Sequence, residues 1–194
     1  MNSLTYSKFP SQTQLNPAPE LLVEKWLNVN ESLSLKKLRG KIIALFAFQM
    51  LCPACTEHSI PQAKRVHQTF ASEDVAVIGL HTVFEHHQAM KEESLKAFLH
   101  EYRVNFPVAI DLPADDEHDP IPQTMRTYRT QGTPTLLLFD RNGRLRQHKF
   151  GHEHDLVLGA EIMALLREES FDIALAGNPS NNYGRCSVET GCQL

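Results

Sequence analysis

Two of the four cysteines, Cys52 and Cys55, are separated only by Pro53 and Ala54. A Cys-X-X-Cys pair is typical of two chemistries, a redox-active dithiol and part of a metal site. In the redox case one thiolate attacks a disulfide, and the second thiol resolves the mixed disulfide that forms. In the metal case both sulfurs are ligands. The spacing alone is compatible with both.

The segments around the pair favour the redox chemistry. Residues 41–48 form a nearly continuous apolar run, the pattern of a strand covered on both faces. Pro53 suits the first turn of a helix, where its missing N–H group is not needed. Cys52 is then expected near the helix N-terminus, where free N–H groups and the helix dipole stabilise a thiolate. Cys55, one turn further in, is placed to attack a mixed disulfide at Cys52.

The other two cysteines, Cys186 and Cys192, lie in a segment rich in Gly, Asn and Ser. Five residues separate them, so they are able to close a small disulfide. Two interpretations remain open. They are either a second redox pair that relays electrons to or from Cys52 and Cys55, with the tail raising the effective concentration, or an exposed pair without a role.

A further motif is Gly132-Thr133-Pro134-Thr135, at the start of an apolar run. A proline at the entrance of a strand cannot donate a ladder hydrogen bond, so it belongs at an edge or in a tight turn. Because only about 5–6% of X–Pro bonds are cis in folded proteins, the residues alone predict a trans turn proline.

The elements that position these motifs alternate along the chain. Asn142-Gly143 is a strong hairpin signal between the fourth and fifth strands. The alternation predicts an α/β fold, a mixed sheet with helices on both faces. We expect strands at 41–48, 75–80, 106–110, 135–140 and 144–150. We expect helices from Pro53 to Phe70, kinked at Pro61, and then at 92–102, 123–129 and 155–168, the last with Leu156, Ile162, Leu165 and Leu166 largely on one side.

Length and composition predict one domain with extensions at each end. We expect an extended lead-in over 1–19, a domain over 20–170 and a flexible tail over 171–194. The formal charge of −4 at pH 7 indicates neither a nucleic-acid nor a membrane partner. The first twenty residues lack a basic stretch followed by an apolar run, so we expect a cytoplasmic protein.

Several of these segments resemble the thioredoxin superfamily, and in particular its TlpA/ResA-like branch. The resemblance rests on CPAC after a buried strand, Leu38-Arg-Gly-Lys41, Asn105-Phe-Pro-Val108, and GTPT before a strand–NG–strand hairpin. It covers residues 20–170, and the motifs fall in the family order. It implies a thioredoxin-like fold with a helical insertion over 81–105, before the FPV strand.

The resemblance also implies the roles of the site residues. Pro134 is expected as a cis-proline facing the cysteines, and Thr133 as a backbone docking point for a thiol substrate. Leu51 stands where the family often has Trp, so the rim of the site is altered. No bound cofactor is expected, because the cysteines carry the electrons. The expected partners are a disulfide-containing protein or a small thiol, and an electron donor of the thioredoxin or glutathione type.

An acidic group near the buried cysteine is a further implication of the resemblance, since such enzymes commonly use one as proton acceptor. Glu85, in the insertion, is the candidate. A glutamate in a polar loop is also compatible with a simple solvated role.

A peroxiredoxin-like thiol peroxidase is the nearest alternative, because it shares the fold. That family carries Pro and Thr or Ser ahead of its nucleophile, whereas Leu45 and Gln49 occupy those positions before Cys52. The hydroxyl that would orient a peroxide is therefore not supplied locally.

A non-enzymatic metal binder is an alternative from another class. The chain has ten histidines, including the pair His152 and His154. The four cysteines lack zinc-finger spacing, however, and histidines often serve as ordinary solvated side chains. We therefore predict no metal site and favour a thiol–disulfide oxidoreductase.

Overall fold

The centre of the molecule is a pair of parallel strands, β2 (Ile42–Phe48) and β3 (Val75–His81). A computed structural model describes residues 16–116 and 118–176. The pairing runs in register from Ile42 opposite Val75 to Phe48 opposite His81, and every residue of β2 is buried. Helices or loops cover both faces of β2, and this explains the continuous apolar run in its sequence.

Six strands form one sheet in the order β1-β4-β3-β2-β5-β6. β4 (Val108–Asp111) is parallel to β3, whereas β5 (Thr135–Phe139) is antiparallel to both β2 and β6 (Leu145–Phe150). The predicted mixed sheet is therefore confirmed. The hairpin at Asn142-Gly143 is confirmed as well, with Gly143 at a φ of 77°.

Strand β1 (Val23–Leu27) is absent from the sequence-based prediction. It pairs antiparallel with β4 at the edge of the sheet, and its register shifts between Val23 and Lys25. The sequence VEKWL lacks regular apolar–polar alternation because Glu24 and Lys25 are both exposed at this irregularity. An edge strand of this kind carries no period-2 signal.

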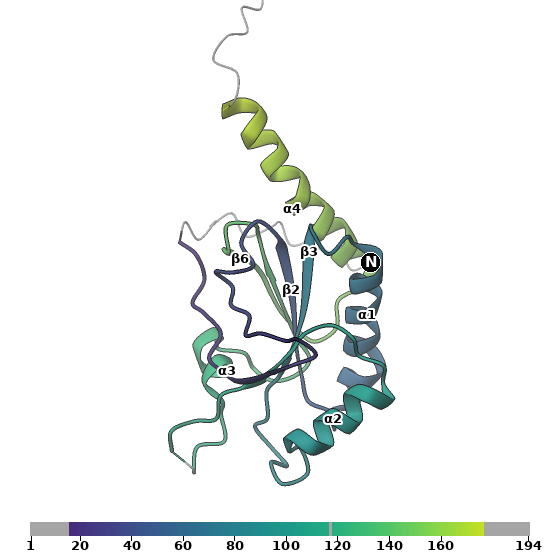
Figure 1. The fold of residues 1–194 in the computed structure, drawn as a ribbon, viewed down its shortest axis with the longest axis vertical. Coiled ribbons are helices and arrows are strands. Elements are labelled where there is room, and N and C mark those ends of the chain that lie inside the picture. Colours follow the sequence, from purple (N-terminus) through teal and green to yellow (C-terminus); the bar gives the residue numbers. More distant parts are fainter. Residues whose placement is uncertain (1–15, 117, 177–194) are drawn as a thin grey trace, which may run out of the picture.

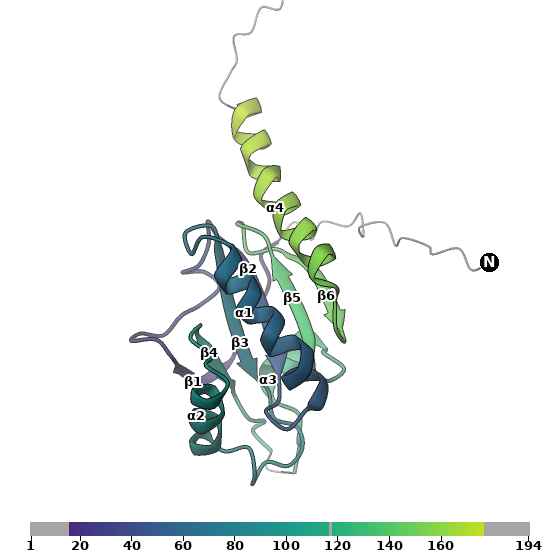
Figure 2. The same ribbon diagram turned by 90° about the vertical axis from the view of Figure 1, so that its right-hand side faces the viewer.

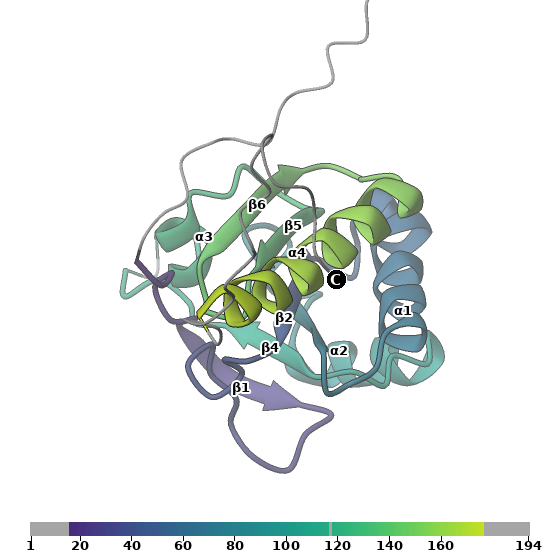
Figure 3. The same ribbon diagram turned by 90° about the horizontal axis from the view of Figure 1, so that it is seen from above.

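Three helices cover one face of the sheet and one short helix covers the other (Figures 1 and 2). α1 (Ile60–Thr69), α2 (Glu92–Glu101) and α4 (Asp155–Ala176) pack on the side of Phe46 and Phe48. α3 (Gln123–Tyr128) packs on the opposite side through Tyr128. Figure 3 shows the same layers from above. The helical insertion predicted between β3 and β4 is thus α2.

The last helix differs from its prediction in length and in orientation. α4 continues to Ala176, beyond the predicted end at 168, so the expected boundary between domain and tail at 170 falls inside a helix. Leu156 is 89% exposed, whereas Leu158, Ile162 and Leu165 are buried. The prediction that Leu156 faces the core was wrong, because the buried stripe begins one half-turn later.

Within residues 16–116 and 118–176, no helix is long and apolar enough to cross a membrane. Cys186 and Cys192 lie outside the described residues, as do residues 1–15 of the expected lead-in.

Candidate active site

The Cys52–Cys55 pair lies where β2 ends and a helix begins, as predicted. The helix starts at Pro53. The Cys52 N–H donates to the Gln49 carbonyl over 3.2 Å, and the Cys52 carbonyl accepts from the Cys55 and Thr56 N–H groups over 3.0 and 3.1 Å. Cys52 is therefore locked into the first turn with its side chain half-buried, and Cys55 is fully buried.

The helix that carries the pair is irregular. A π-helical turn, η1 (Cys55–Ser59), precedes α1, and the Ile60 N–H donates to the Cys55 carbonyl. Pro61 follows directly and has no N–H group for an ordinary helical hydrogen bond. The irregularity expected at Pro61 thus takes the form of a widened turn just before it, a feature that recurs at functional sites.

Thr133 lies against the cysteine pair, although 81 residues separate it from Cys52. The Cys52 Sγ donates to the Thr133 carbonyl over 3.6 Å, and the Thr133–Pro134 peptide bond is cis. The Thr135 hydroxyl donates to the Gly132 carbonyl over 2.7 Å, and the Gly151 N–H donates to the Pro134 carbonyl. This loop, residues 132–135, is therefore fixed on both sides of the contact with Cys52.

The Cys52 and Cys55 thiols differ in how deeply they are buried. Both are free in this structure. Burial raises the pKa of the Cys55 thiol to about 12, and a hydrogen bond with Cys52 adds to the rise. The Cys55 thiol therefore keeps its proton at neutral pH, and it is not accessible to a protein substrate. Cys52, at the helix start, is the sulfur that a substrate can reach.

Apolar side chains surround the accessible sulfur. Leu51 is 54% exposed, and Pro53 is exposed beside it. Two aromatic residues that the sequence analysis missed lie close to the loop 132–135. A Cβ added to Gly132 would stand 3.2 Å from the Phe150 ring and 4.0 Å from the Phe84 ring. Neither has a recognisable motif, because Phe150 ends an edge strand and Phe84 lies in the insertion.

Glu85, the expected proton acceptor, is exposed on the loop between β3 and α2. Among the described residues, no hydrogen bond or ion pair joins Glu85 to either cysteine. Its catalytic role stays a prediction that rests on the family resemblance alone.

Buried polar groups are found instead at the ends of the neighbouring strands. Asp111 accepts hydrogen bonds from the Thr82 hydroxyl and from the Thr124 and Met125 N–H groups, while burial raises the pKa of its carboxyl. His81 is buried, its Nε2 has no hydrogen-bond partner, and burial lowers its pKa to about 4. The sequence analysis gave neither residue a role at the active site, because neither belongs to a recognisable motif.

The histidines do not assemble a metal centre in the described part of the chain. The His58 and His152 rings lie 5.1 Å apart, and the His152 and His154 rings 6.1 Å apart. Across residues 16–116 and 118–176, no group of three or more His, Cys, Asp or Glu side chains is arranged to hold a metal ion. Nothing in this geometry favours the metal-binding alternative.

The similarity of the chain to known proteins assigns it to a family. The model of the AhpC/TSA family matches residues 15–148. The chain belongs to the AhpC/TSA family. Within this family it groups with the thioredoxin-like thiol–disulfide oxidoreductases, as the resemblance implied.

Two solved structures of similar proteins match this chain at high sequence identity. One is a thioredoxin-like superfamily protein, 55% identical, with a TM-score of 0.76 over 78% of this chain and 97% of that protein. The other is a thiol-disulfide isomerase from Corynebacterium glutamicum, 49% identical, with a TM-score of 0.75 over the same shares. These similarities confirm the thioredoxin-like fold.

Curated relatives are more distant. The thiol-disulfide oxidoreductase ResA of Halalkalibacterium halodurans is 24% identical over 168 residues, which cover 85% of this chain and 86% of ResA. The DipZ protein of Mycobacterium bovis is 28% identical over 154 residues, 78% of this chain. The chain spans only 21% of the length of DipZ, so the match concerns one part of that protein.

Proposed function

We propose that the protein reduces disulfides with the Cys52–Cys55 dithiol. The observation that carries the proposal is the asymmetry of the pair. The accessible Cys52 Sγ contacts the Thr133 carbonyl, and the protonated Cys55 thiol is buried one turn behind it. This arrangement suits a nucleophile at the surface and a resolving thiol that substrates cannot reach.

The proposed cycle has two exchange steps. The Cys52 thiolate attacks one sulfur of the substrate disulfide, a Cys52–substrate bond forms, and the other substrate sulfur leaves as a thiolate. Cys55 then loses its proton and attacks the Cys52 sulfur, which releases the second substrate thiol and leaves a Cys52–Cys55 disulfide. Two electrons have passed to the substrate, and a thiol donor restores the pair, either one thioredoxin-type dithiol or two glutathione-type monothiols.

Thr133 and Pro134 are the proposed docking edge for the substrate. The Thr133 carbonyl already accepts from the Cys52 Sγ, so a substrate sulfur bonded to Cys52 lies beside this loop. Leu51, Pro53, Phe84 and Phe150 then provide apolar contact around the reacting sulfurs. Reduction as the working direction requires a compartment that keeps the pair as a dithiol, and we propose the cytoplasm.

Peroxide reduction is less well supported, despite the family name. Leu45 is buried in β2, and Gln49 is buried with its Nε2 unpaired. A glutamine side chain at position 49 supplies no hydroxyl, so the peroxidase pattern is missing at this position.

Two variants test the proposal. We expect Cys52→Ser to abolish the reduction of insulin and of hydroxyethyl disulfide, because the accessible thiol of the Cys52–Cys55 pair is removed. We expect Cys55→Ser to lose turnover and to accumulate a mixed disulfide with the substrate, which intact-mass spectrometry detects. Melting temperatures control for folding, and hydrogen peroxide is assayed in parallel. An active Cys52→Ser variant, or peroxide consumption faster than disulfide reduction, would overturn the assignment.

A further inference from the structure

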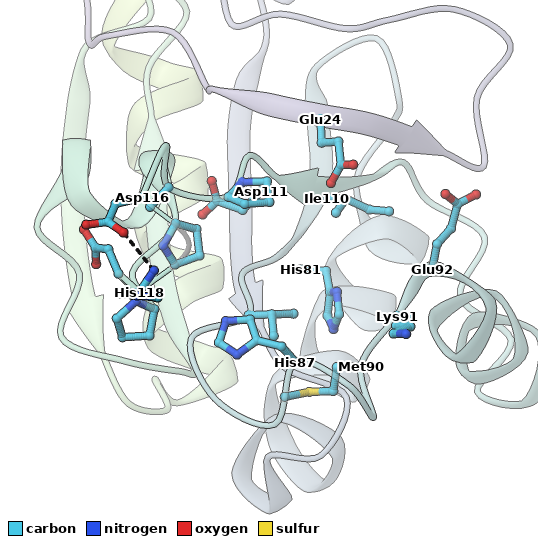
Figure 4. A pocket seen from close by; sticks show the side chains of 16 residues that line it. Glu24, His81, His87, Met90, Lys91, Glu92, Ile110, Asp111, Asp116 and His118 are labelled. Atoms are coloured by element: carbon cyan, nitrogen blue, oxygen red, sulfur yellow. Dashed lines mark hydrogen bonds between the residues drawn. The ribbon is translucent and has the colours of Figure 1, made fainter.

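A cavity of about 590 Å³ opens at one end of the sheet, and Figure 4 shows the side chains that line it. Cys52 follows β2 at the same end of the sheet. The cavity lies at the carboxyl ends of β3 and β4, where ligands bind in open α/β sheets. Its volume is within the usual range for ligand sites, roughly 300–1,000 Å³. The cycle proposed above uses none of its lining residues.

The polar lining of this cavity is rich in carboxylates. Five of them line it, together with the three histidines His81, His87 and His118, with Lys91 as the single lysine and no arginine in the described part of the chain. Glu92 is already paired with Lys25 and Lys96, and Asp119 is paired with Arg126. Of these five, Glu24, Asp111 and Asp116 have no cationic partner among the described residues.

A buried and unpaired imidazole gives a second, independent indication of a ligand. His81 lines the cavity, is 1% exposed, and its Nε2 has no hydrogen-bond partner. Figure 4 shows the ring near the middle of the lining side chains, pointing between His87 and Lys91. A buried polar nitrogen without a partner is costly, so a ligand that bonds to it gains affinity. Because burial keeps this imidazole neutral, it does not repel a cation.

The remaining walls are apolar and suit an aliphatic stem. Met90, Ile110 and several prolines line the cavity between its charged groups. Lysine and arginine have this combination of a long apolar stem and a cationic head, and they bury the stem while the head pairs with polar groups. The chemistry of the lining therefore matches a basic side chain better than a small anion or a purely apolar group.

The loop after β3 links the cavity to the redox site. Its residues Val83 and His87 line the cavity, while Phe84 lies beside Gly132, next to the Thr133 carbonyl that contacts Cys52. Adjacent strands are about 4.8 Å apart, so β4 lies roughly 10 Å from β2. An extended peptide covers about 3.3 Å per residue. A side chain two to four residues from a cysteine bound at Cys52 therefore reaches the cavity.

We propose that this cavity binds a lysine or arginine side chain of the disulfide substrate, two to four residues from the cysteine that Cys52 attacks. The proposal rests on the proposed disulfide reduction and names a class of substrate for it, basic polypeptides. Glu24 and Asp116 attract the cationic head, and the His81 imidazole offers a hydrogen-bonding nitrogen deeper in the cavity.

The test uses matched peptides on the full chain. Each peptide carries one intramolecular disulfide and a single lysine placed two, three or four residues before or after the attacked cysteine, and its twin carries glutamine there. The measured quantity is the ratio of kcat/KM for the lysine peptide to that for its twin. Exposed ion pairs typically contribute a factor of about two to five each, so we expect a ratio of about four or more for at least one placement.

Charge variants assign the preference to the cavity. We expect Glu24→Gln and Asp116→Asn each to lower the ratio two- to five-fold, and Lys91→Gln to raise it. Glu93→Gln removes the same charge from an exposed position of α2 that does not line the cavity, and should leave the ratio unchanged. The preference should also weaken as salt concentration rises.

The outcomes separate this proposal from the proposed function. If hydroxyethyl disulfide and all the peptides resist reduction, the disulfide reductase assignment fails. If all the peptides are reduced but no lysine placement gives a ratio above one, the cavity proposal alone is wrong. Equal effects of Glu24→Gln and Glu93→Gln would also overturn it, because the preference would then reflect net charge.

Discussion

At the scale of single residues, burial divides the labour between two chemically identical thiols. Cys52 and Cys55 are one helical turn apart, yet Cys52 contacts the Thr133 carbonyl at the edge of the site and Cys55 is enclosed by the core. In the proposed cycle, the raised pKa of Cys55 keeps it as a neutral thiol until the mixed disulfide forms next to it. Under this proposal, depth in the protein sets the order of attack, because the two residues are chemically the same.

The buried His81, at the end of β3, predicts that the protein loses stability in acid. Burial lowers the pKa of His81 from 6.5 to about 4, so the unfolded chain binds this proton more readily than the folded one. The stabilising effect of the neutral folded form is complete above pH 6.5 and is lost as the pH falls toward 4. We expect this single group to remove about 2 kcal/mol of unfolding free energy between pH 7 and pH 4.5.

Urea unfolding at both pH values measures this loss. His81→Gln, which does not titrate, should lose about 2 kcal/mol less than the wild type on acidification. His100→Gln is the control, because its side chain is 83% exposed, and it should follow the wild type. If the unfolding free energy of the wild type and of His81→Gln fell equally with pH, His81 would not carry the effect.

At the scale of elements, each helix contributes through a narrow buried stripe. In α4 the stripe consists of Leu158, Ile162 and Leu165, which pack on the face of the sheet that carries α1. The sequence predicted Ile162 and Leu165 of this stripe but wrongly placed Leu156 with them, because α4 contains more apolar residues than one face can bury. Only packing against the sheet decides which of them are covered.

Leu156 and Ile162, two side chains of similar size in α4, allow a direct comparison. Ile162 is completely buried, so Ile162→Ala should cost about 2–5 kcal/mol of unfolding free energy through lost contacts and a cavity. Leu156→Ala should change stability by less than about 0.5 kcal/mol, because Leu156 is 89% exposed. Urea unfolding of both variants measures the difference. Comparable losses would mean that α4 packs in another register.

At the scale of the whole molecule, the sheet brings three distant segments to one edge. The end of β2 carries Cys52, the loop after β3 carries Phe84, and the loop before β5 carries Thr133. Sequence patterns predicted the strands, the Cys-X-X-Cys helix and the loop 132–135, since each has a local signal. Sequence patterns missed β1, the two aromatic residues Phe84 and Phe150, and the burial of His81 and of Asp111. These features depend on contacts between segments far apart in the chain.

Gly132 tests whether these long-range contacts position the site. Its φ of 153° disfavours other residues, and an added Cβ would press against the Phe150 ring at 3.2 Å. Gly132→Ala should therefore cost about 1–3 kcal/mol of unfolding free energy. It should also lower kcat/KM for hydroxyethyl disulfide, because the loop moves the Thr133 carbonyl away from Cys52. Thermal unfolding and the reduction assay measure the two effects together.

Gly159 in α4 provides the matched control for this substitution. A Cβ added there meets nothing within 4 Å, and alanine favours a helix over glycine by about 0.5–1 kcal/mol. Gly159→Ala should therefore raise stability and leave disulfide reduction at the wild-type rate. If Gly132→Ala behaved in the same way, the loop 132–135 would tolerate displacement, and its contact with Cys52 would not be needed for the reaction. A loss confined to Gly132→Ala would instead show that the position of the loop 132–135 matters for the reaction.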